Sequence, residues 1–234
     1  MPPLPPSRFF PPADMADEDG LIGVGSELSP EWVLDAYAHG IFPWPVGELD
    51  EPMFWWSLDP RAILEFDALH VSRSLRRVLR SGRFEVTCDH DFAGVIRRCA
   101  RGPGREGGTW ITPRMIRAYT RLFELGHAHS VEVWHEGRLA GGVYGVAIAG
   151  LFAAESMFYR VRDASKVALV HLVEHLRRRG YRLLDIQQLS PHTARLGAVE
   201  ISRGEYLGRL ADALAVPVTF GDTLASSGLP PPEG

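Results

Sequence analysis

Three polar residues lie in segments whose other residues are apolar enough to form buried strands. Glu155 follows the four apolar residues 151–154, and Asp185 and Gln187 belong to the segment Leu183-Leu184-Asp185-Ile186-Gln187. A carboxylate buried in a strand costs on the order of several kcal/mol unless it is paired or hydrogen-bonded. Asp185 and Gln187 are two residues apart, so their side chains should face the same side of a strand. The pattern predicts either a structural hydrogen-bond network or the floor of an active site that positions an amine.

A second motif, His171-Leu172-Val173-Glu174-His175, has the H-x-x-E-H spacing of one class of zinc protease. The surrounding sequence predicts a helix over 164–179 in which apolar residues occupy one side. His171, Glu174 and His175 then share the polar stripe of that helix. We therefore expect these side chains to face solvent, and we expect no metal site here.

The elements that must position these residues can be predicted from periodicity and capping residues. Apolar segments predict strands at 84–87, 130–134, 139–149, 151–158 and 183–187. Helical spacing between N-capping residues and terminal glycines predicts helices at 30–39, 72–81, 91–100, 113–125 and 164–179, with a further short strand and helix within 194–214. Strands separated by helices indicate an α/β or α+β fold with a mixed sheet.

The first 60 residues have the composition of a separate small unit. Residues 2–12 contain six prolines and predict an extended arm, and three tryptophans fall within residues 44–56. These tryptophans form either a hydrophobic cluster that docks the unit on a larger one or an aromatic wall beside a ligand. We predict a small N-terminal domain over 1–60 and a second domain over 61–234.

Charge is unevenly distributed along a chain whose net charge is −4. Residues 1–60 hold one arginine against eleven acidic residues, whereas residues 61–122 hold 13 arginines against six acidic residues. This excludes a general nucleic-acid coating protein but allows a local basic patch that faces a polyanion. The alternative is that these arginines form solvated helix faces. The candidates on the helix at 72–81 are Arg76, Arg77 and Arg80.

Hydropathy and cysteine content limit the possible location of the protein. The mean hydropathy is −0.07, and the sequence lacks the long apolar segment that a membrane helix needs. Cys88 and Cys99 lack metal-ligand spacing and are expected to be reduced thiols in a cytosol.

Beyond these residues, a series of motifs between about residues 20 and 210 resembles the leucyl/phenylalanyl-tRNA–protein transferase family. The motifs are Ile41-Phe42-Pro43-Trp44, Trp55-Trp56-Ser57-Leu58-Asp59-Pro60-Arg61, Gly108-Thr109-Trp110-Ile111-Thr112, Gly126-His127-Ala128-His129, Gly141-Gly142-Val143-Tyr144-Gly145, Glu155-Ser156-Met157-Phe158, Asp163-Ala164-Ser165-Lys166, Asp185-Ile186-Gln187, His192 and Leu196-Gly197-Ala198. Each motif is weak alone, but together and in order they are specific.

The resemblance implies an α+β protein with a small N-terminal domain and a C-terminal mixed-sheet domain of the acetyltransferase (GNAT) type. It implies a monomeric cytoplasmic enzyme of the N-degron pathway of protein degradation. Such an enzyme moves Leu or Phe, and less efficiently Met, from aminoacyl-tRNA to the N-terminal Arg or Lys of a protein. The acyl ester is already activated, so no ATP, metal or other cofactor is expected.

The resemblance also implies roles for individual residues. Asp185 and Gln187 match the proposed catalytic pair, and Glu155 matches its acidic partner. An amide is a poor base, so we expect Gln187 to orient the amine and Asp185 to polarise it. Trp44 and Trp110 match aromatic residues around the substrate end of the tRNA. The residues that match the amino-acid pocket are Val143, Phe152, Met157, Leu169, Leu172, Leu176 and Leu184.

Several positions depart from the family pattern. Ala154 replaces a Gly, Val143 stands where Met is common, and Leu172 and Leu176 can be Phe in relatives. These changes could resize the pocket and leave the preference between Leu and Phe open.

A coenzyme A-dependent N-acyltransferase on the same fold is the main alternative. Such enzymes hold the pyrophosphate in a glycine-rich turn before a long helix, but here that turn is Arg160-Val161-Arg162-Asp163-Ala164-Ser165. A helix N-terminus with two arginines suits an anion, and a tRNA phosphate held by Arg160, Arg162 and Lys166 fits better than coenzyme A. A third possibility is a non-catalytic module that binds tRNA ends or N-terminal peptides.

Overall fold

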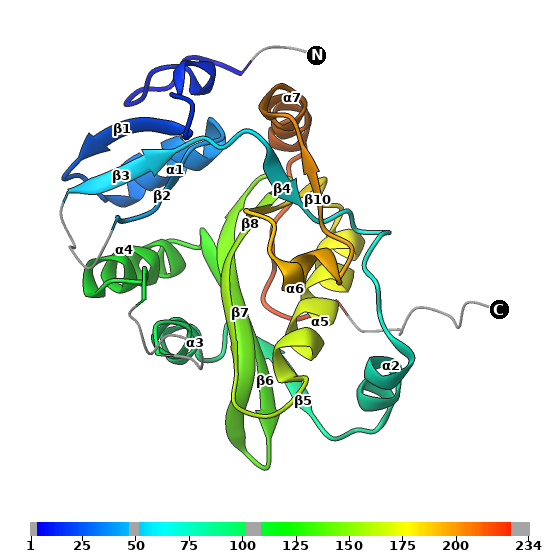
Figure 1. The fold of residues 1–234 in the computed structure, drawn as a ribbon. Helices are drawn as coiled ribbons and strands as arrows, with labels where there is room; N and C mark the ends of the chain where they lie inside the picture. The colour runs from blue at the N-terminus through cyan, green and yellow to red at the C-terminus, as the bar shows by residue number, and fades with distance from the viewer. Residues whose placement is uncertain (1–3, 47–51, 102–108, 226–234) are drawn as a thin grey trace.

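The computed structural model describes residues 4–46, 52–101 and 109–225, which form two sheets and the helices around them (Figure 1). The smaller sheet has the order β1-β3-β2 and is antiparallel. Its strands are β1 (Leu21–Gly25), β2 (Phe42–Pro43) and β3 (Met53–Trp56), with the 3-10 turn η1 (Ala13–Met15) before them and helix α1 (Pro30–Ala38) between β1 and β2.

The larger sheet has seven strands in the order β10-β4-β9-β8-β7-β6-β5. Strands β8 and β9 pair in parallel, and the other described neighbours pair antiparallel. The mixed sheet confirms the α+β class. Its strands are β4 (Arg61–Ile63), β5 (Glu85–Cys88), β6 (Ala128–His135), β7 (Arg138–Ile148), β8 (Leu151–Tyr159), β9 (Leu183–Gln187) and β10 (Val199–Ile201).

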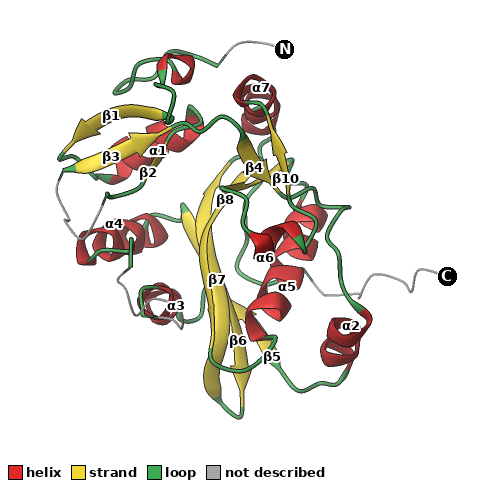
Figure 2. Ribbon diagram, viewed as in Figure 1, coloured by secondary structure: helices red, strands yellow, loops and turns green. Residues whose placement is uncertain are grey.

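Helices cover both faces of the larger sheet (Figure 2). Helices α3 and α4 pack on one face, α5 packs on the other, and α7 contacts β8 and β9. The sheet therefore separates two clusters of buried residues, one toward α3, α4 and the N-terminal unit and one toward α5. The helices are α2 (Arg73–Arg80), α3 (Phe92–Cys99), α4 (Pro113–Glu124), α5 (Ala164–Arg179), α6 (Pro191–Ala194) and α7 (Arg203–Leu214).

The small three-stranded sheet was not among the predicted elements. β2 has two residues and β3 has four, which is too short for a period to emerge from the sequence. Residue 60 lies between β3 and β4, where the chain passes from the smaller sheet to the larger one.

The expectation that His175 faces solvent is wrong. His175 is fully buried, with Nε2 2.9 Å from the carbonyl oxygen of Phe220 and Nδ1 2.9 Å from the backbone N–H of Ala225. The chain after α7 returns across this side of α5 and covers it. The described residues contain no group of three or more potential metal-ligating side chains.

Candidate active site

Glu155 is placed by a β-bulge between β7 and β8. Tyr144 pairs with Ser156 and Gly145 pairs with Ala154, so Glu155 is the extra residue on β8. A bulge of this kind bends a strand and redirects the inserted side chain. Gly145 permits the close approach, because a Cβ atom there would lie 2.3 Å from the carbonyl oxygen of Ala153.

Two tyrosines from different elements hold the Glu155 carboxylate. The hydroxyl of Tyr37, on α1, donates to Oε1 at 2.6 Å, and the hydroxyl of Tyr119, on α4, donates to Oε2 at 3.2 Å. The two hydroxyl oxygens are 2.7 Å apart. Burial raises the pKa of Glu155 to about 7, and Asp185 adds to the rise, whereas both tyrosines and Arg61 oppose it. This carboxyl group can therefore change its protonation state near neutral pH.

The parallel strands β8 and β9 separate beside Glu155. Their pairing ends at Ala153 and Asp185, although β8 continues to Tyr159. Gln187, at the end of β9, has a φ of 58°, a left-handed conformation that is uncommon for residues other than glycine and that clusters at functional sites. With its amide oriented to satisfy its neighbours, the Gln187 nitrogen donates to the carbonyls of Ala154 at 3.0 Å and Ile186 at 3.1 Å. The amide thus spans the gap between the strands.

Asp185 lies in a buried ion pair. Arg61, on β4, donates from Nε to Oδ1 at 2.9 Å and from Nη2 to Oδ2 at 2.6 Å. Tyr206, on α7, donates its hydroxyl to Oδ2 at 2.9 Å, and the backbone N–H of Gln187 donates to Oδ1 at 2.9 Å. The carboxylate is thereby fully engaged, and its link to Gln187 runs through the backbone rather than the side chain.

Arg61 is held as tightly as its partner. Its guanidinium lies over the rings of Phe42 and Tyr206, at 4.5 and 4.6 Å from their centroids, and Nη1 donates to the carbonyl of Gly40 at 3.2 Å. Burial by itself lowers the pKa of Arg61, but the Asp185 carboxylate, together with Tyr206 and Tyr37, outweighs this effect, and the pKa is raised. Arg61 therefore remains charged inside the protein.

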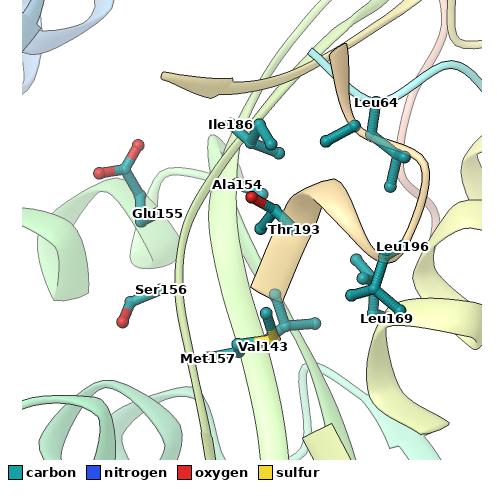
Figure 3. A pocket seen from close by; sticks show the side chains of 11 residues that line it. Leu64, Val143, Ala154, Glu155, Ser156, Met157, Leu169, Ile186, Thr193 and Leu196 are labelled. Carbon is teal, nitrogen blue, oxygen red and sulfur yellow. The ribbon is translucent and has the colours of Figure 1, made fainter. Parts of the chain in front are cut away.

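A cavity of about 220 Å³ opens where β8 and β9 separate (Figure 3). Most of its wall is apolar, and the side chains of Glu155 and Ser156 lie on the opposite side of β8 from Leu169 and Leu196 in the view. We call it the apolar cavity. It is lined by Leu64, Val143, Ala154, Glu155, Ser156, Met157, Leu169, Ile186, Thr193, Leu196 and Ala198.

The residues predicted for the amino-acid pocket fall into two groups. Val143, Met157 and Leu169 line the apolar cavity. The other four belong to the buried cluster on the same side of the sheet without appearing in the cavity wall: Phe152, Leu172, Leu176 and Leu184.

Trp44 and Trp110 come together although 66 positions separate them in the sequence. Their rings stack with centroids 4.5 Å apart and an interplanar angle of 17°. Trp44 follows β2 and Trp110 precedes α4, so the pair joins the N-terminal unit to the helices on one face of the large sheet.

The predicted basic residues lie at the surface on two elements. On α2, Arg77 and Arg80 are exposed, whereas Arg76 is half-buried and donates from Nε to the carbonyl of Val71 at 3.0 Å. Before α5, Arg160 and Arg162 are exposed.

Lys166 is half-buried in the first turn of α5 and pairs with Asp163 at 3.2 Å. The structure thus separates the predicted cations into a helix face and a turn rather than one cluster.

Four contributors to the site were missed by the sequence analysis: Arg61, Tyr37, Tyr119 and Tyr206. Three of them are tyrosines at helical positions, which ordinarily predict core packing. Arg61 precedes the apolar residues 62–64. A charged residue at the start of an apolar strand is the feature of the sequence that indicates a buried ion pair at this position.

Two protein-family models match the chain. The leucyl/phenylalanyl-tRNA protein transferase model matches residues 63–211, and the model of that transferase's N-terminal domain matches residues 26–59. The chain belongs to this family. The resemblance inferred from the motifs is confirmed.

Curated relatives named as leucyl/phenylalanyl-tRNA–protein transferases are similar over nearly the whole chain. The transferase of Magnetococcus marinus is 52% identical over 217 residues, which cover 91% of each chain. That of an Anaeromyxobacter strain is 54% identical over 220 residues, covering 93% of this chain and 92% of its own.

Among solved structures, a ribosomal-protein-alanine N-acetyltransferase from Brucella melitensis has a TM-score of 0.33 at 18% identity, covering 48% of this chain and 85% of its own. The structure of L-PGS from Bacillus licheniformis has a TM-score of 0.38 at 16% identity, covering 69% of this chain and 53% of its own.

In the described part of the chain, no helix has the length and apolar character needed to cross a membrane.

Proposed function

We propose that the protein transfers Leu or Phe, and less efficiently Met, from aminoacyl-tRNA to the α-amine of proteins that begin with Arg or Lys. The product would carry an N-terminal degradation signal, and the enzyme would act in the cytoplasm as a monomer. The observation that carries the proposal is the apolar cavity with Glu155 in its wall, in a chain that belongs to this transferase family.

The donor side chain would occupy the apolar cavity. Val143, Met157 and Leu169 offer it only apolar atoms, and each buried methylene contributes about 0.8 kcal/mol. Such a wall favours Leu, Phe and Met over Ala, and it rejects a β-branched side chain only by shape. Discrimination among large unbranched side chains is therefore expected to be modest.

The reaction is the aminolysis of an ester. The acceptor nitrogen forms a bond to the acyl carbon, the bond from that carbon to the ribose oxygen breaks, and the ribose oxygen leaves with a proton. An α-amine has a pKa near 8, so about a tenth is neutral at pH 7. Positioning can then supply most of the rate.

Gln187 would orient the attacking amine. Its amide nitrogen is committed to the carbonyls of Ala154 and Ile186, which leaves its carbonyl oxygen to accept a hydrogen bond from the amine. Asp185 fixes the backbone of Gln187 and, with Arg61, acts as a positioning residue. Glu155 would supply negative charge for a cationic acceptor and could take up the proton that the amine loses.

The donor nucleotide would lie near the stacked pair Trp44 and Trp110, whose aromatic surfaces suit a base. The residues that would contribute phosphate contacts are Arg76, Arg77, Arg80, Arg160, Arg162 and Lys166. Among the predicted pocket residues, Phe152, Leu172, Leu176 and Leu184 would support the cavity wall from behind.

The test is a transfer assay with labelled Leu-, Phe-, Met- and Val-tRNA and peptides that begin with Arg, Lys or Ala. We expect label on the Arg and Lys peptides from Leu and Phe, weaker transfer from Met, and little from Val. An Arg peptide with an acetylated N-terminus is the matched control, because only its amine is blocked. Acetyl transfer from acetyl-CoA, or binding of tRNA without turnover, would contradict the proposal.

A further inference from the structure

A second cavity lies beside the apolar one and has a different chemical character. It measures about 400 Å³, and we call it the basic cavity. Its wall contains one lysine, one arginine and two histidines, and none of the described residues that line it is acidic. The lining residues are His70, Ser72, Leu75, Lys166, His192, Arg195 and Leu196.

The basic cavity lies between the apolar cavity and helix α2. Leu196 lines both cavities, so they share a wall. Ser72 caps the N-terminus of α2 and Leu75 lies in its first turn, and the same helix carries the exposed Arg77 and Arg80. A chain of phosphates that starts beside the apolar cavity could therefore pass through the basic cavity to α2.

Three of the basic side chains of this cavity come from α5 and from α6 with the residue that follows it. Lys166 lies in the first turn of α5, where Asp163 holds its ammonium at 3.2 Å. Arg195 follows α6 and is exposed, and His192, on α6, is half-buried. Burial lowers the pKa of His192, and the neighbouring Lys166 and Arg195 lower it further. His192 is therefore neutral more readily, and the positive charges of Lys166 and Arg195 in the wall favour an anionic occupant.

We propose that the basic cavity binds phosphate groups of the 3′-terminal nucleotides of aminoacyl-tRNA, with Lys166 and Arg195 as charged contacts and His192 as a hydrogen-bond donor. The inference rests on the proposed function and adds a subsite to it. RNA is favoured over the pyrophosphate of coenzyme A because the start of α2 borders the cavity, and the same helix carries the exposed Arg77 and Arg80, which could contact further phosphates. The turn before α5 contains no glycine, which also argues against a pyrophosphate site of the coenzyme A type.

The decisive experiment compares donors with and without phosphate. Wild type, Arg195→Ala and Lys166→Ala are assayed with Leu-tRNA, with a leucylated CCA trinucleotide and with 3′-leucyl-adenosine, which has no phosphate. We expect each substitution to raise KM about tenfold for the tRNA and the trinucleotide, because a charge-assisted contact is lost, with kcat unchanged. KM for leucyl-adenosine should stay constant. Arg138→Ala, on the β6–β7 hairpin, is the control and should change none of these values.

Each other outcome overturns the inference. An unchanged KM for Leu-tRNA would show that the cavity does not contact RNA, and an equal loss with leucyl-adenosine would show a structural role. Competition by coenzyme A against Leu-tRNA that disappears in Arg195→Ala would assign the cavity to coenzyme A. Absence of transfer from every donor in wild type would instead contradict the proposed function, so the two failures are distinguishable.

Discussion

Glu155 combines an inserted backbone position with two tyrosine hydroxyl partners. The bulge opposite Gly145 directs the Glu155 side chain away from regular strand geometry. Tyr37 and Tyr119 stabilise the ionised carboxylate, but burial has the larger effect and raises the pKa of Glu155 to about 7. A glutamate that changes charge near neutral pH can attract a cationic acceptor or receive a proton. The same property affects stability.

Glu155→Gln is expected to reduce the dependence of stability on pH. Because its pKa is raised, Glu155 binds a proton more tightly in the folded than in the unfolded protein. The free energy of unfolding should therefore fall as the pH rises from about 4.5 through about 7, by up to about 3 kcal/mol. Urea unfolding of both proteins at pH 5 and pH 8 measures this difference. Glu200→Gln, at an exposed position, is the control, and an equal fall in wild type and Glu155→Gln would contradict the assignment.

Val143→Phe is expected to reduce Phe transfer more than Leu transfer. The new ring would occupy part of a cavity of only about 220 Å³, and an aromatic donor needs more width than Leu. Transfer rates from Leu-, Phe-, Met- and Val-tRNA give the ratio. The control is Leu122→Ala, which removes a buried side chain of α4 that belongs to the other buried cluster and does not line the cavity. It should cost about 2–5 kcal/mol of stability and leave the ratio unchanged. An equal loss for all donors with Val143→Phe would show that Val143 does not contact the donor.

Between elements, the Arg61–Asp185 pair joins β4 to β9 and, through Tyr206, to α7. It fixes β9 at the point where β8 departs from it, and it therefore determines the position of Gln187. A buried ion pair is weak evidence for stability, but removal of one partner leaves an uncompensated charge.

Asp185→Ala is accordingly expected to lose about 3–5 kcal/mol of stability as well as activity. The double variant Arg61→Met/Asp185→Leu removes both charges and should recover most of the stability, which urea unfolding will measure. Activity should remain low in the double variant, because Gln187 loses the carboxylate that holds its backbone. Full activity in that variant would show that the ion pair has no positioning role.

Gly145→Ala tests whether the bulge between β7 and β8 is needed to place Glu155. The added Cβ would lie 2.3 Å from the Ala153 carbonyl oxygen and 2.5 Å from the Phe152 ring, so the strands must shift. We expect a loss of transfer activity together with a lower melting temperature. Gly25→Ala, on β1, meets no atom within 4 Å and should behave as wild type. A fully active Gly145→Ala protein would contradict this role of the bulge.

The sequence was sufficient to predict the elements from β6 to β9, because strands of five to eleven residues and a helix of 16 residues carry clear periods. It was also sufficient to single out Glu155, Asp185 and Gln187, since polar groups in apolar strands are conspicuous. It could not place Tyr37 or Tyr206, because each acts through a partner that only the tertiary structure brings near. The same holds for the four predicted pocket residues that lie outside the cavity wall. Matching motifs to a family shows which segments form the pocket, but it does not show which side of a helix or strand faces the cavity.

At the scale of the whole molecule, the acidic N-terminal unit contributes side chains to the candidate active site. It contributes Tyr37 to the Glu155 carboxylate, Phe42 to the Arg61 guanidinium and Trp44 to the stack with Trp110. Its many acidic residues and the many arginines of 61–122 divide the molecule into regions of opposite charge. This division would suit the two substrates proposed above, a polyanion and a cationic N-terminus.

The affinity for tRNA is expected to fall steeply with salt and to depend on α2. Arg77 and Arg80 are exposed on that helix, and each phosphate contact contributes about 0.7–0.9 to the slope of log K against log salt. Loss of both in Arg77→Ala/Arg80→Ala should therefore make the slope shallower by about 1.4–1.8. Binding titrations of Leu-tRNA across a range of salt concentrations measure this slope. Arg8→Ala is the matched control, because Arg8 is also exposed but lies on the N-terminal unit beside Glu31. A double variant with the wild-type slope would show that these two arginines form only a solvated helix face and that the tRNA approaches elsewhere.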